Sequence, residues 1–220
     1  MRIRILIPLW KRPEVTRFCF EGVKRLQKES RHQIDVSCVL SEEEFIDTCS
    51  EFGFDWHFAP NNPLGQKMNI GIASTLKYDY DYLMIMNSDN VVESELIDRV
   101  YEPFFESLNP YFGIGKVTYV NFYTHEAKEV TYSLTILGIA KMIHRSVLKK
   151  STKLYRPELN RCLDNTMMDV MIALGISPTF VDYEGMLAMD FKSEVNIWTW
   201  EQFANKGKTV CYKPKLEEAN

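Results

Sequence analysis

Short apolar runs alternate along the chain with segments whose apolar residues recur at helical spacing. The first run, Arg2 to Leu9, is rich in isoleucine and leucine, which predicts a buried strand. From Glu14 to Lys28 apolar residues return every three or four positions, which predicts a crossover helix. Gln33 to Leu40 and Tyr82 to Met86 are two further apolar runs typical of strands. Strands that alternate with helices predict an α/β fold with a mostly parallel sheet.

The rest of the chain continues this alternation. It predicts strands near 56–58, 115–122 and 134–143, and helices over 42–47, 66–76, 93–108 and 161–174. No repeat and no Gly/Ser linker divides the sequence, so we expect residues 1–205 to form a single domain. Residues 206–220 are rich in lysine and glutamate, which is typical of a polar carboxyl-terminal tail.

Composition narrows the class of protein. The 220 residues are 45% hydrophobic and 25% charged, proportions of a globular protein without a large disordered region. The formal net charge of −4 disfavours nucleic acid as the main partner. The five cysteines are scattered and match neither a zinc site nor a disulfide framework. No segment has the length of a signal-peptide core or a membrane span, so we expect a cytoplasmic protein.

The loop after the first predicted strand combines an aromatic ring with two cations. Trp10 stands beside Lys11 and Arg12, at the edge of the sheet where ligands bind in open α/β folds. An aromatic plane suits a nucleotide base, and cations suit its phosphates. An ordinary solvent-exposed loop is the alternative interpretation of these residues.

Three polar residues follow the apolar run at Tyr82 to Met86. Asn87, Ser88 and Asp89 offer oxygen atoms at the end of a buried strand, and oxygen ligands suit Mg²⁺ or Mn²⁺. An ion that bridges a diphosphate would stabilise the charge of a departing nucleotide. Turn formation alone also explains these residue types.

Together these segments resemble family 2-like glycosyltransferases of the GT-A fold, from residue 5 to about residue 198. Such enzymes open with a strand that ends in a Pro-aromatic-Lys/Arg loop, which Pro8-Leu9-Trp10-Lys11-Arg12-Pro13 resembles. The resemblance implies a Rossmann-like, mostly parallel central sheet flanked by helices and a UDP- or GDP-sugar as the donor. It also implies that Pro8, Trp10 and Arg12 contact the donor nucleotide.

Two further segments carry the resemblance. Leu64-Gly65-Gln66-Lys67-Met68-Asn69 is similar to the family's Gly-containing loop, which implies that Lys67 and Asn69 contact the nucleotide. The family's Asp-x-Asp metal signature falls at Asn87-Ser88-Asp89, which implies Asp89 as the main metal ligand and Asn87 and Ser88 as donor contacts. Asn87 replaces the first Asp, and an amide supplies no charge to hold a cation.

A catalytic base is implied by a third match. The family carries Glu-Asp about eleven residues before a glycine that ends a helix, and counting back from Gly175 gives Asp164, with Leu163 in place of the glutamate. As a base, Asp164 would accept the proton of an acceptor hydroxyl, and transfer would invert the anomeric carbon. An acid in the first turn of a helix is the alternative reading of Asp164. Asp169 is the second candidate for the base.

The segment 189–198 mixes charged and aromatic residues and is expected to close over the donor diphosphate. Lys192 is the natural phosphate contact in this segment, and Asp190 is a second metal or acceptor contact. An amphipathic loop packed by its aromatic residues explains the same pattern without a ligand.

We therefore predict a metal-dependent glycosyltransferase that acts on a nucleotide sugar and on the hydroxyl of a glycan, a lipid-linked glycan, a protein or a modified DNA base. A catalytically silent nucleotide-sugar-binding protein is one alternative, because Asn87 and Leu163 replace acids of the family pattern. A nucleotidyltransferase is another, but it would need a Gly-rich phosphate loop where Leu9 to Pro13 has no glycine. A DNA-modifying enzyme is disfavoured by the acidic pI of about 5.7.

Overall fold

Parallel pairing of the first strands sets the architecture of the computed structural model, which describes residues 1–195 and 199–212. Strand β1 (Arg2–Leu9) pairs in parallel with β2 (Gln33–Leu40) on one side and with β4 (Tyr82–Ile85) on the other. Strand β3 (Asp55–Phe58) continues the sheet beyond β2, also in parallel. The predicted α/β fold with a mostly parallel central sheet is confirmed.

Three more strands complete this seven-stranded sheet, in the order β10-β6-β9-β4-β1-β2-β3. They are β6 (Tyr111–Ile114), β9 (Lys141–His144) and β10 (Thr179–Val181). Strand β9 runs antiparallel to β4, so its first residue, Lys141, pairs with Ile85 at the carboxyl end of β4. This register brings a lysine to the edge where β1 and β4 end.

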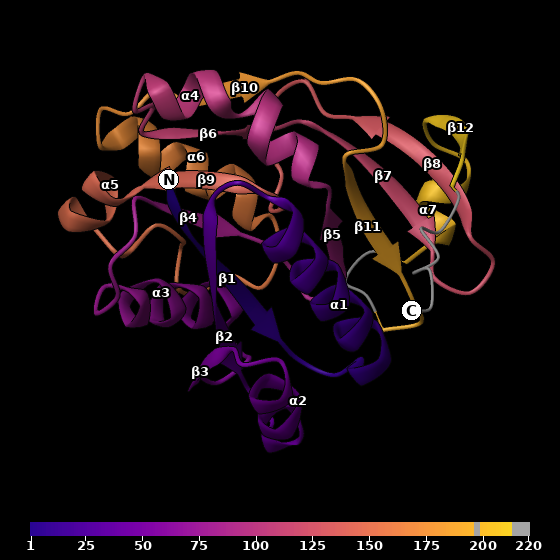
Figure 1. Cartoon of the computed structure of the whole chain (residues 1–220), viewed down its shortest axis with the longest axis horizontal. Helices are drawn as coiled ribbons and strands as arrows, with labels where there is room; N and C mark the ends of the chain where they lie inside the picture. The colour runs from indigo at the N-terminus through magenta and orange to yellow at the C-terminus, as the bar shows by residue number, and fades with distance from the viewer. Residues whose placement is uncertain (196–198, 213–220) are drawn as a thin grey trace.

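A second sheet of five strands lies beside the first (Figure 1). Its order is β12 (Lys208–Cys211), β8 (Glu126–Thr131), β7 (Lys116–Asn121), β11 (Ala188–Lys192) and β5 (Asn90–Val92). Strand β5 begins directly after Asp89 and pairs antiparallel with β11, with Asp190 opposite Asn90. The second sheet therefore passes beside the residues that follow β4.

Helices cover both faces of the seven-stranded sheet (Figure 1). On one face lie α1 (Pro13–Glu29), α2 (Ile46–Glu51), the π-helical turn η2 (Leu96–Val100) and α4 (Glu102–Glu106). On the other lie α3 (Leu64–Thr75), α5 (Arg145–Lys150) and α6 (Leu163–Ala173). Short helices η1 (Glu43–Phe45) and α7 (Glu201–Ala204) complete the elements among the described residues.

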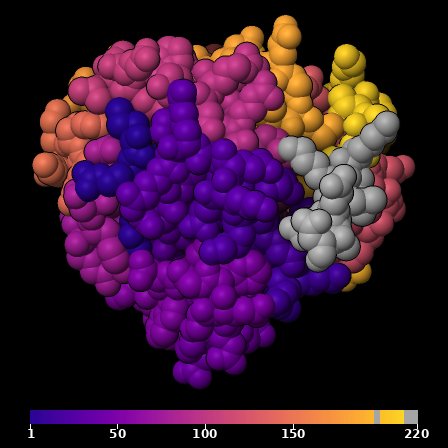
Figure 2. Space-filling model, in the orientation of Figure 1, coloured from indigo at the N-terminus to yellow at the C-terminus, as the bar shows by residue number. Residues whose placement is uncertain are grey.

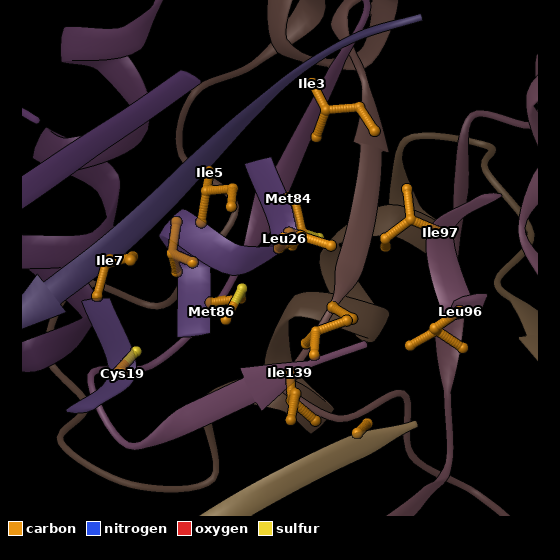
Figure 3. Close-up of a cluster of buried hydrophobic side chains, with 14 of the residues drawn as sticks. Ile3, Ile5, Ile7, Cys19, Leu26, Met84, Met86, Leu96, Ile97 and Ile139 are labelled. Atoms are coloured by element: carbon orange, nitrogen blue, oxygen red, sulfur yellow. The ribbon is translucent and has the colours of Figure 1, made fainter. Parts of the chain in front are cut away.

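Alternating side chains of β1 divide the core between these two layers of helices. Ile3, Ile5 and Ile7 pack in the cluster that includes Cys19 and Leu26 of α1 (Figure 3). The intervening Leu6 belongs to the cluster on the α3 face. Burial of each such side chain contributes about 1.5–3 kcal/mol. Because β1 is buried on both faces, its sequence from Ile5 to Leu9 is a continuous apolar run rather than an alternation.

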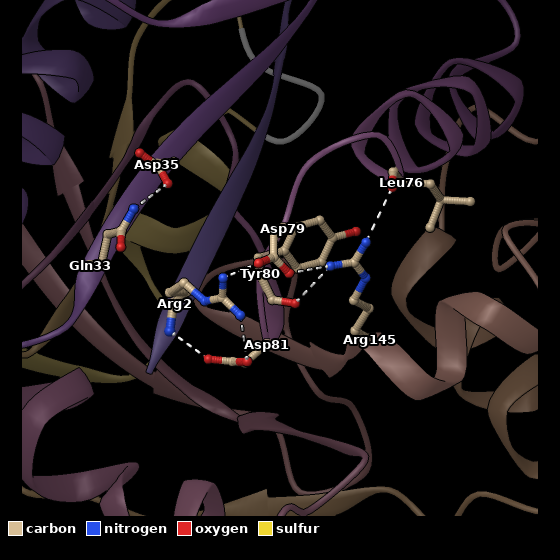
Figure 4. A network of polar contacts seen from close by, with 8 residues as sticks. All are labelled: Arg2, Gln33, Asp35, Leu76, Asp79, Tyr80, Asp81 and Arg145. Atoms are coloured by element: carbon tan, nitrogen blue, oxygen red, sulfur yellow. Dashed lines mark hydrogen bonds and ion pairs between the residues drawn. The ribbon is translucent and has the colours of Figure 1, made fainter.

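Charged residues join three elements at the amino end of β1, opposite the carboxyl end that the predicted site residues follow. Arg2 forms ion pairs with Asp79 and Asp81, and Arg145 forms a second ion pair with Asp79, with 2.9 Å between Nη1 and Oδ1 (Figure 4). Exposed pairs of this kind contribute about 0–1 kcal/mol each. Their role is to tie the start of β1 to the turn before β4 and to the start of α5.

The region between 93 and 143 differs from its predicted elements. The helix predicted over 93–108 is divided into η2 and α4. The strand predicted over 134–143 is wrong for residues 134–140, because the strand of this region, β9, begins only at Lys141. Strand β8 was not predicted, because its sequence Glu-Ala-Lys-Glu-Val-Thr is mostly polar and it exposes much of its surface.

The predicted polar tail contains a strand. Lys208–Cys211 forms β12, which pairs antiparallel with β8, whereas residues 213–220 lie outside the described residues. Residues 196–198 of the predicted closing segment also lie outside them. In the space-filling view, the indigo and purple surface of the N-terminal part of the chain fills the centre of the face, and the orange and yellow residues lie toward its upper right (Figure 2). Within the described ranges no helix is long and apolar enough to cross a membrane.

The first turn of α3 packs so closely on the segment before α6 that we expect only glycine to fit at position 65. A Cβ at Gly65 would lie 2.0 Å from the carbonyl oxygen of Arg156, and the Gly65 N–H donates to the Leu159 carbonyl at 2.8 Å. Gly65→Ala is expected to lower the free energy of unfolding by about 1–3 kcal/mol. Urea unfolding followed by circular dichroism measures the change, with the exposed neighbour Gln66→Ala as the control. Equal stability of the two variants would contradict this close packing.

Candidate functional site

Residues from three distant parts of the sequence meet beside the carboxyl end of β4. A Cβ at Gly138 would lie 3.1 Å from Oδ1 of Asp164 and 3.6 Å from Nδ2 of Asn87. The Asn87 amide and the Asp164 carboxylate therefore both lie next to Gly138. Both residues were singled out from the sequence, whereas Gly138 was not.

Two donors hold the Asp164 carboxylate. Oδ1 lies 2.6 Å from Nζ of Lys141, and Oδ2 accepts a hydrogen bond from the Gly138 N–H at 2.9 Å. Asp164 is the second residue of α6, but the N-cap position belongs to Cys162, which makes no side-chain cap. The carboxylate therefore contacts the segment before β9 instead of capping its own helix. It is one third exposed, 33%, which leaves it open to solvent beside its two donors.

Lys141 is a site residue that the sequence patterns do not indicate. Its side chain is fully buried, at 0% exposure, and it enters the site because β9 begins opposite Ile85. A buried ammonium is costly unless it is paired, and Asp164 supplies the pair. The signal in the sequence was a single charge inside the apolar run Ile139-Ala140-Lys141-Met142-Ile143.

A second group of charges lies where β5 and β11 pair, and we call it the charge cluster: Arg12, Asp89, Asp190 and Lys192. Nη1 of Arg12 donates to Oδ2 of Asp89 at 2.6 Å, and Nη2 donates to the Ser88 hydroxyl at 2.9 Å. Nζ of Lys192 lies 2.8 Å from Oδ1 of Asp190. The four side chains are between 6% and 14% exposed, so each cation has a carboxylate partner away from bulk water.

The backbone conformation directs Arg12 into the charge cluster. Lys11 and Arg12 have φ values of 55° and 58°, both in the left-handed region, and Arg12 is the N-cap of α1. Non-glycine residues in this region cost about 1–3 kcal/mol each and are found mostly at functional sites. On the opposite side, the Phe191 N–H donates to the Asp89 carbonyl at 2.7 Å, which fixes β11 against Asp89.

Burial and neighbouring charges act in opposite directions on the two carboxyl groups of the charge cluster. Burial disfavours ionisation of Asp89, but the charges of Arg12 and Lys192 outweigh it and lower the Asp89 pKa. Burial raises the pKa of Asp190 to about 6, with Lys192 opposing and Asp89 adding to the rise. Of the two carboxyl groups, Asp89 is therefore the one whose ionised form is more strongly stabilised by neighbouring cations.

The residues around Asp89 do not fit a protein-bound divalent ion. Arg12 and Lys192 already neutralise the two carboxylates, and no group of three or more His, Cys, Asp or Glu in the described part of the chain could hold a metal. Two unit charges about 4 Å apart interact by about 4 kcal/mol near a protein surface. The repulsion between a guanidinium and a divalent ion is twice the repulsion between two singly charged cations at the same distance. Metal binding at Asp89 therefore stays a prediction that these contacts do not support.

The other predicted donor contacts lie in different surroundings. Nζ of Lys67 is buried and donates to the Leu9 carbonyl at 2.6 Å, at the end of β1. Asn69 instead exchanges two hydrogen bonds, at 2.8 and 3.0 Å, with the backbone of Tyr155. Its amide therefore fastens the segment before α6 to α3.

The remaining predicted residues differ in exposure. Trp10 is 37% exposed, with Nζ of Lys11 at 4.5 Å from its ring centre. Pro8 is half-buried within β1. Asp169 is exposed on α6, and its position five residues after Asp164 turns it to a different side of the helix. Six of the sequence-predicted residues thus form two groups, one of Arg12, Ser88, Asp89 and Lys192 and one of Asn87 and Asp164, and Pro8, Trp10, Lys67 and Asn69 belong to neither.

Comparison with known proteins identifies similar structures only. No family model and no curated protein matches the sequence. TarS of S. aureus has a TM-score of 0.64 and 12% sequence identity, over 87% of this chain and 37% of TarS. The TarS 1–349 structure in complex with UDP-GlcNAc has a TM-score of 0.62 and 14% identity, over 89% of this chain and 60% of that one.

A mannosyltransferase, PcManGT from Pyrobaculum calidifontis in complex with GDP-Man and Mn²⁺, is also similar. Its TM-score is 0.59 at 7% identity, over 87% of this chain and 57% of the mannosyltransferase. This chain therefore spans less than two thirds of the length of these structures. At such identities the likeness shows the fold, and the chain has the GT-A glycosyltransferase fold.

The buried Lys67 is expected to make stability depend on pH. Burial lowers its pKa to about 7, well below the 10.5 of an exposed lysine. Below pH 7 both folded and unfolded states hold the proton, and the cost of burying the charge is present in full. Above it the folded state loses the proton first, so stability rises with pH. From about pH 6 to about pH 9, the wild type should gain about 3 kcal/mol relative to Lys67→Met.

Urea unfolding at several pH values measures this difference. Lys149→Met is the matched control, because Lys149 is an exposed lysine on α5 and its removal should leave the pH dependence unchanged. Parallel stability curves for the wild type and Lys67→Met would contradict a neutral Lys67 in the folded protein.

Proposed function

We propose that the protein is a glycosyltransferase that moves a sugar from a UDP- or GDP-sugar to a hydroxyl group of an acceptor, with Asp164 as the base. The observation that carries the proposal is the meeting of Asn87 and Asp164 around Gly138, at the edge where β1 and β4 end. That edge is the ligand-binding edge of open α/β sheets. The complexes of similar structures with UDP-GlcNAc and GDP-Man support a nucleotide sugar as the donor.

The proposed reaction is a direct displacement. The acceptor hydroxyl gives its proton to the Asp164 carboxylate as its oxygen bonds to the anomeric carbon. The bond from that carbon to the phosphate oxygen breaks, and the nucleoside diphosphate leaves with the electron pair, so the configuration inverts. Lys141 and the Gly138 N–H are positioning groups, because they fix the direction in which Asp164 presents its oxygens.

The donor is proposed to lie along the loop after β1. Trp10 offers an exposed ring to the base, and Arg12 and Lys192 offer cations to the diphosphate. Lys67 and Pro8 shape the end of β1, and Asn69 acts indirectly by holding Tyr155. No step of this proposal uses Mn²⁺ or Mg²⁺, since Arg12 occupies the carboxylate that was predicted to bind the ion.

A nucleotide-sugar-binding protein without catalysis is the second candidate. It is favoured by one observation, that an amide stands at Asn87 where the family pattern has an acid. The two candidates share a donor site and differ in whether the donor is broken down.

Asp164→Asn is expected to separate binding from turnover. Replacing the base should lower the release of free UDP or GDP from nucleotide sugars by about 100-fold or more, because loss of a general base typically costs that much. Donor binding, measured by calorimetry, should change little, since the diphosphate lies at the charge cluster. Asp169→Asn is the control, an exposed acid on the same helix.

Three outcomes would contradict parts of the proposal. Nucleotide release by Asp164→Asn at the wild-type rate would show that another group is the base. Loss of nucleotide release in Asp169→Asn alone would identify Asp169 as that base. Binding of nucleotide sugars by a wild type that releases no nucleotide, with water or with any acceptor supplied, would favour the silent binding protein.

A further inference from the structure

We infer that Arg12 and Lys192 take the place of a divalent ion toward the donor diphosphate, while Asp89 and Asp190 hold the two cations in position. The inference rests on the proposed function, because it concerns the donor of that reaction. It reverses the role expected for Asp89, which becomes the anchor of an arginine in place of a metal ligand.

The contacts of Arg12 support this assignment first. Its guanidinium makes one hydrogen bond to Asp89 and one to the Ser88 hydroxyl, which together use two of its five N–H donors. Three N–H donors remain, and guanidinium N–H groups bind phosphate oxygens in pairs. A guanidinium held from one side is thus pre-organised for an anion on the other.

Lys192 is held in a comparable way. Its ammonium lies 2.8 Å from Asp190 and 5.0 Å from the centre of the Tyr119 ring, which itself stacks on Phe203 with 3.8 Å between ring centres. These contacts restrict a side chain that would otherwise lose much rotamer freedom on binding. Lys192 comes from β11 and Arg12 from the start of α1, so two separate elements each bring one cation to the cluster.

A metal ion at Asp89 would have to share a carboxylate whose Oδ2 already accepts from Arg12 at 2.6 Å. The guanidinium lies in a largely buried position next to the left-handed backbone of Lys11 and Arg12, so the ion would lie near a cation of the same sign. The second carboxylate, Asp190, offers no relief because Lys192 occupies it. Among the described residues, these contacts favour protein cations over a bound ion at this position.

Nucleotide binding with and without metal tests the inference on the unmodified protein. UDP and GDP are titrated calorimetrically in excess EDTA and in excess MnCl₂. We expect at least one of them to bind in EDTA, with an affinity within about threefold of that in MnCl₂, since the protein supplies the cations. Binding that disappears in EDTA and returns with Mn²⁺ would overturn the inference and leave the proposed function standing. Failure of both nucleotides to bind under either condition would overturn the proposed function, and this inference with it.

Variants of the charge cluster sharpen the test. Arg12→Gln and Lys192→Gln should each weaken binding in EDTA by about tenfold or more, because a charge-assisted contact to phosphate is lost. Arg17→Gln and Lys149→Gln, exposed residues outside the cluster, are the matched controls. If Arg12→Gln folds poorly, Arg12→Lys replaces it in the test. Arg12→Lys keeps the charge and should retain part of the affinity for the nucleotide.

Asp89→Asn gives opposite results for the two roles of Asp89. If Asp89 anchors Arg12, the amide oxygen of Asn can still accept from the guanidinium while a negative charge near the phosphates is removed, so binding in EDTA should be kept or tightened. As a metal ligand, its loss should abolish a Mn²⁺-dependent gain in affinity. Thermal unfolding of every variant shows whether a weak binder is folded, and weaker binding by a folded Asp89→Asn together with a lost Mn²⁺ response would overturn the inference.

Discussion

The structure depends on the burial of β1 on both faces and its pairing on both edges. Ile3, Ile5 and Ile7 point to one layer of helices and Leu6 to the other, and the one charged side chain among them, Arg4, is buried and held by Ser37 and Asp55. The loops that follow β1 and its neighbours are brought to one edge by parallel pairing. The cluster around Asp89 and the group around Asp164 both lie at that edge.

Charges at this edge come in compensated pairs. Lys141 with Asp164, and Arg12 with Asp89, are each joined at 2.6 Å with the cation largely or wholly buried. Removing one member of such a pair typically costs about 3–5 kcal/mol, because the other is left buried without a partner. The two pairs differ in exposure: Asp164 is one third open to solvent, whereas Asp89 is nearly covered. The first is therefore arranged for exchange with a bound molecule, and the second for holding a cation still.

Sequence patterns predicted the elements that bury their own apolar stripe, and they failed where a partner decides the structure. Strand β2 and helix α1 were predicted nearly to the residue, because periodicity is a local property. Strand β8 was missed, since its polar sequence becomes a strand only through pairing with β7 and β12. For the site, the pattern indicated Asp89, Asp164 and Arg12, but neither Lys141 nor the pairing of Arg12 with Asp89. Which cation meets which carboxylate depends on register, such as Lys141 opposite Ile85, and register is not written in any one segment.

The charge cluster lies where the two sheets meet, since Arg12 and Asp89 follow strands of the first and Asp190 and Lys192 belong to the second. The Phe191 N–H to Asp89 carbonyl hydrogen bond, at 2.7 Å, extends the pairing of β11 with β5 up to Asp89. A molecule that draws on both cations would therefore bridge residues of both sheets. The protection of the Phe191 amide against hydrogen exchange would report its binding without any chemistry taking place.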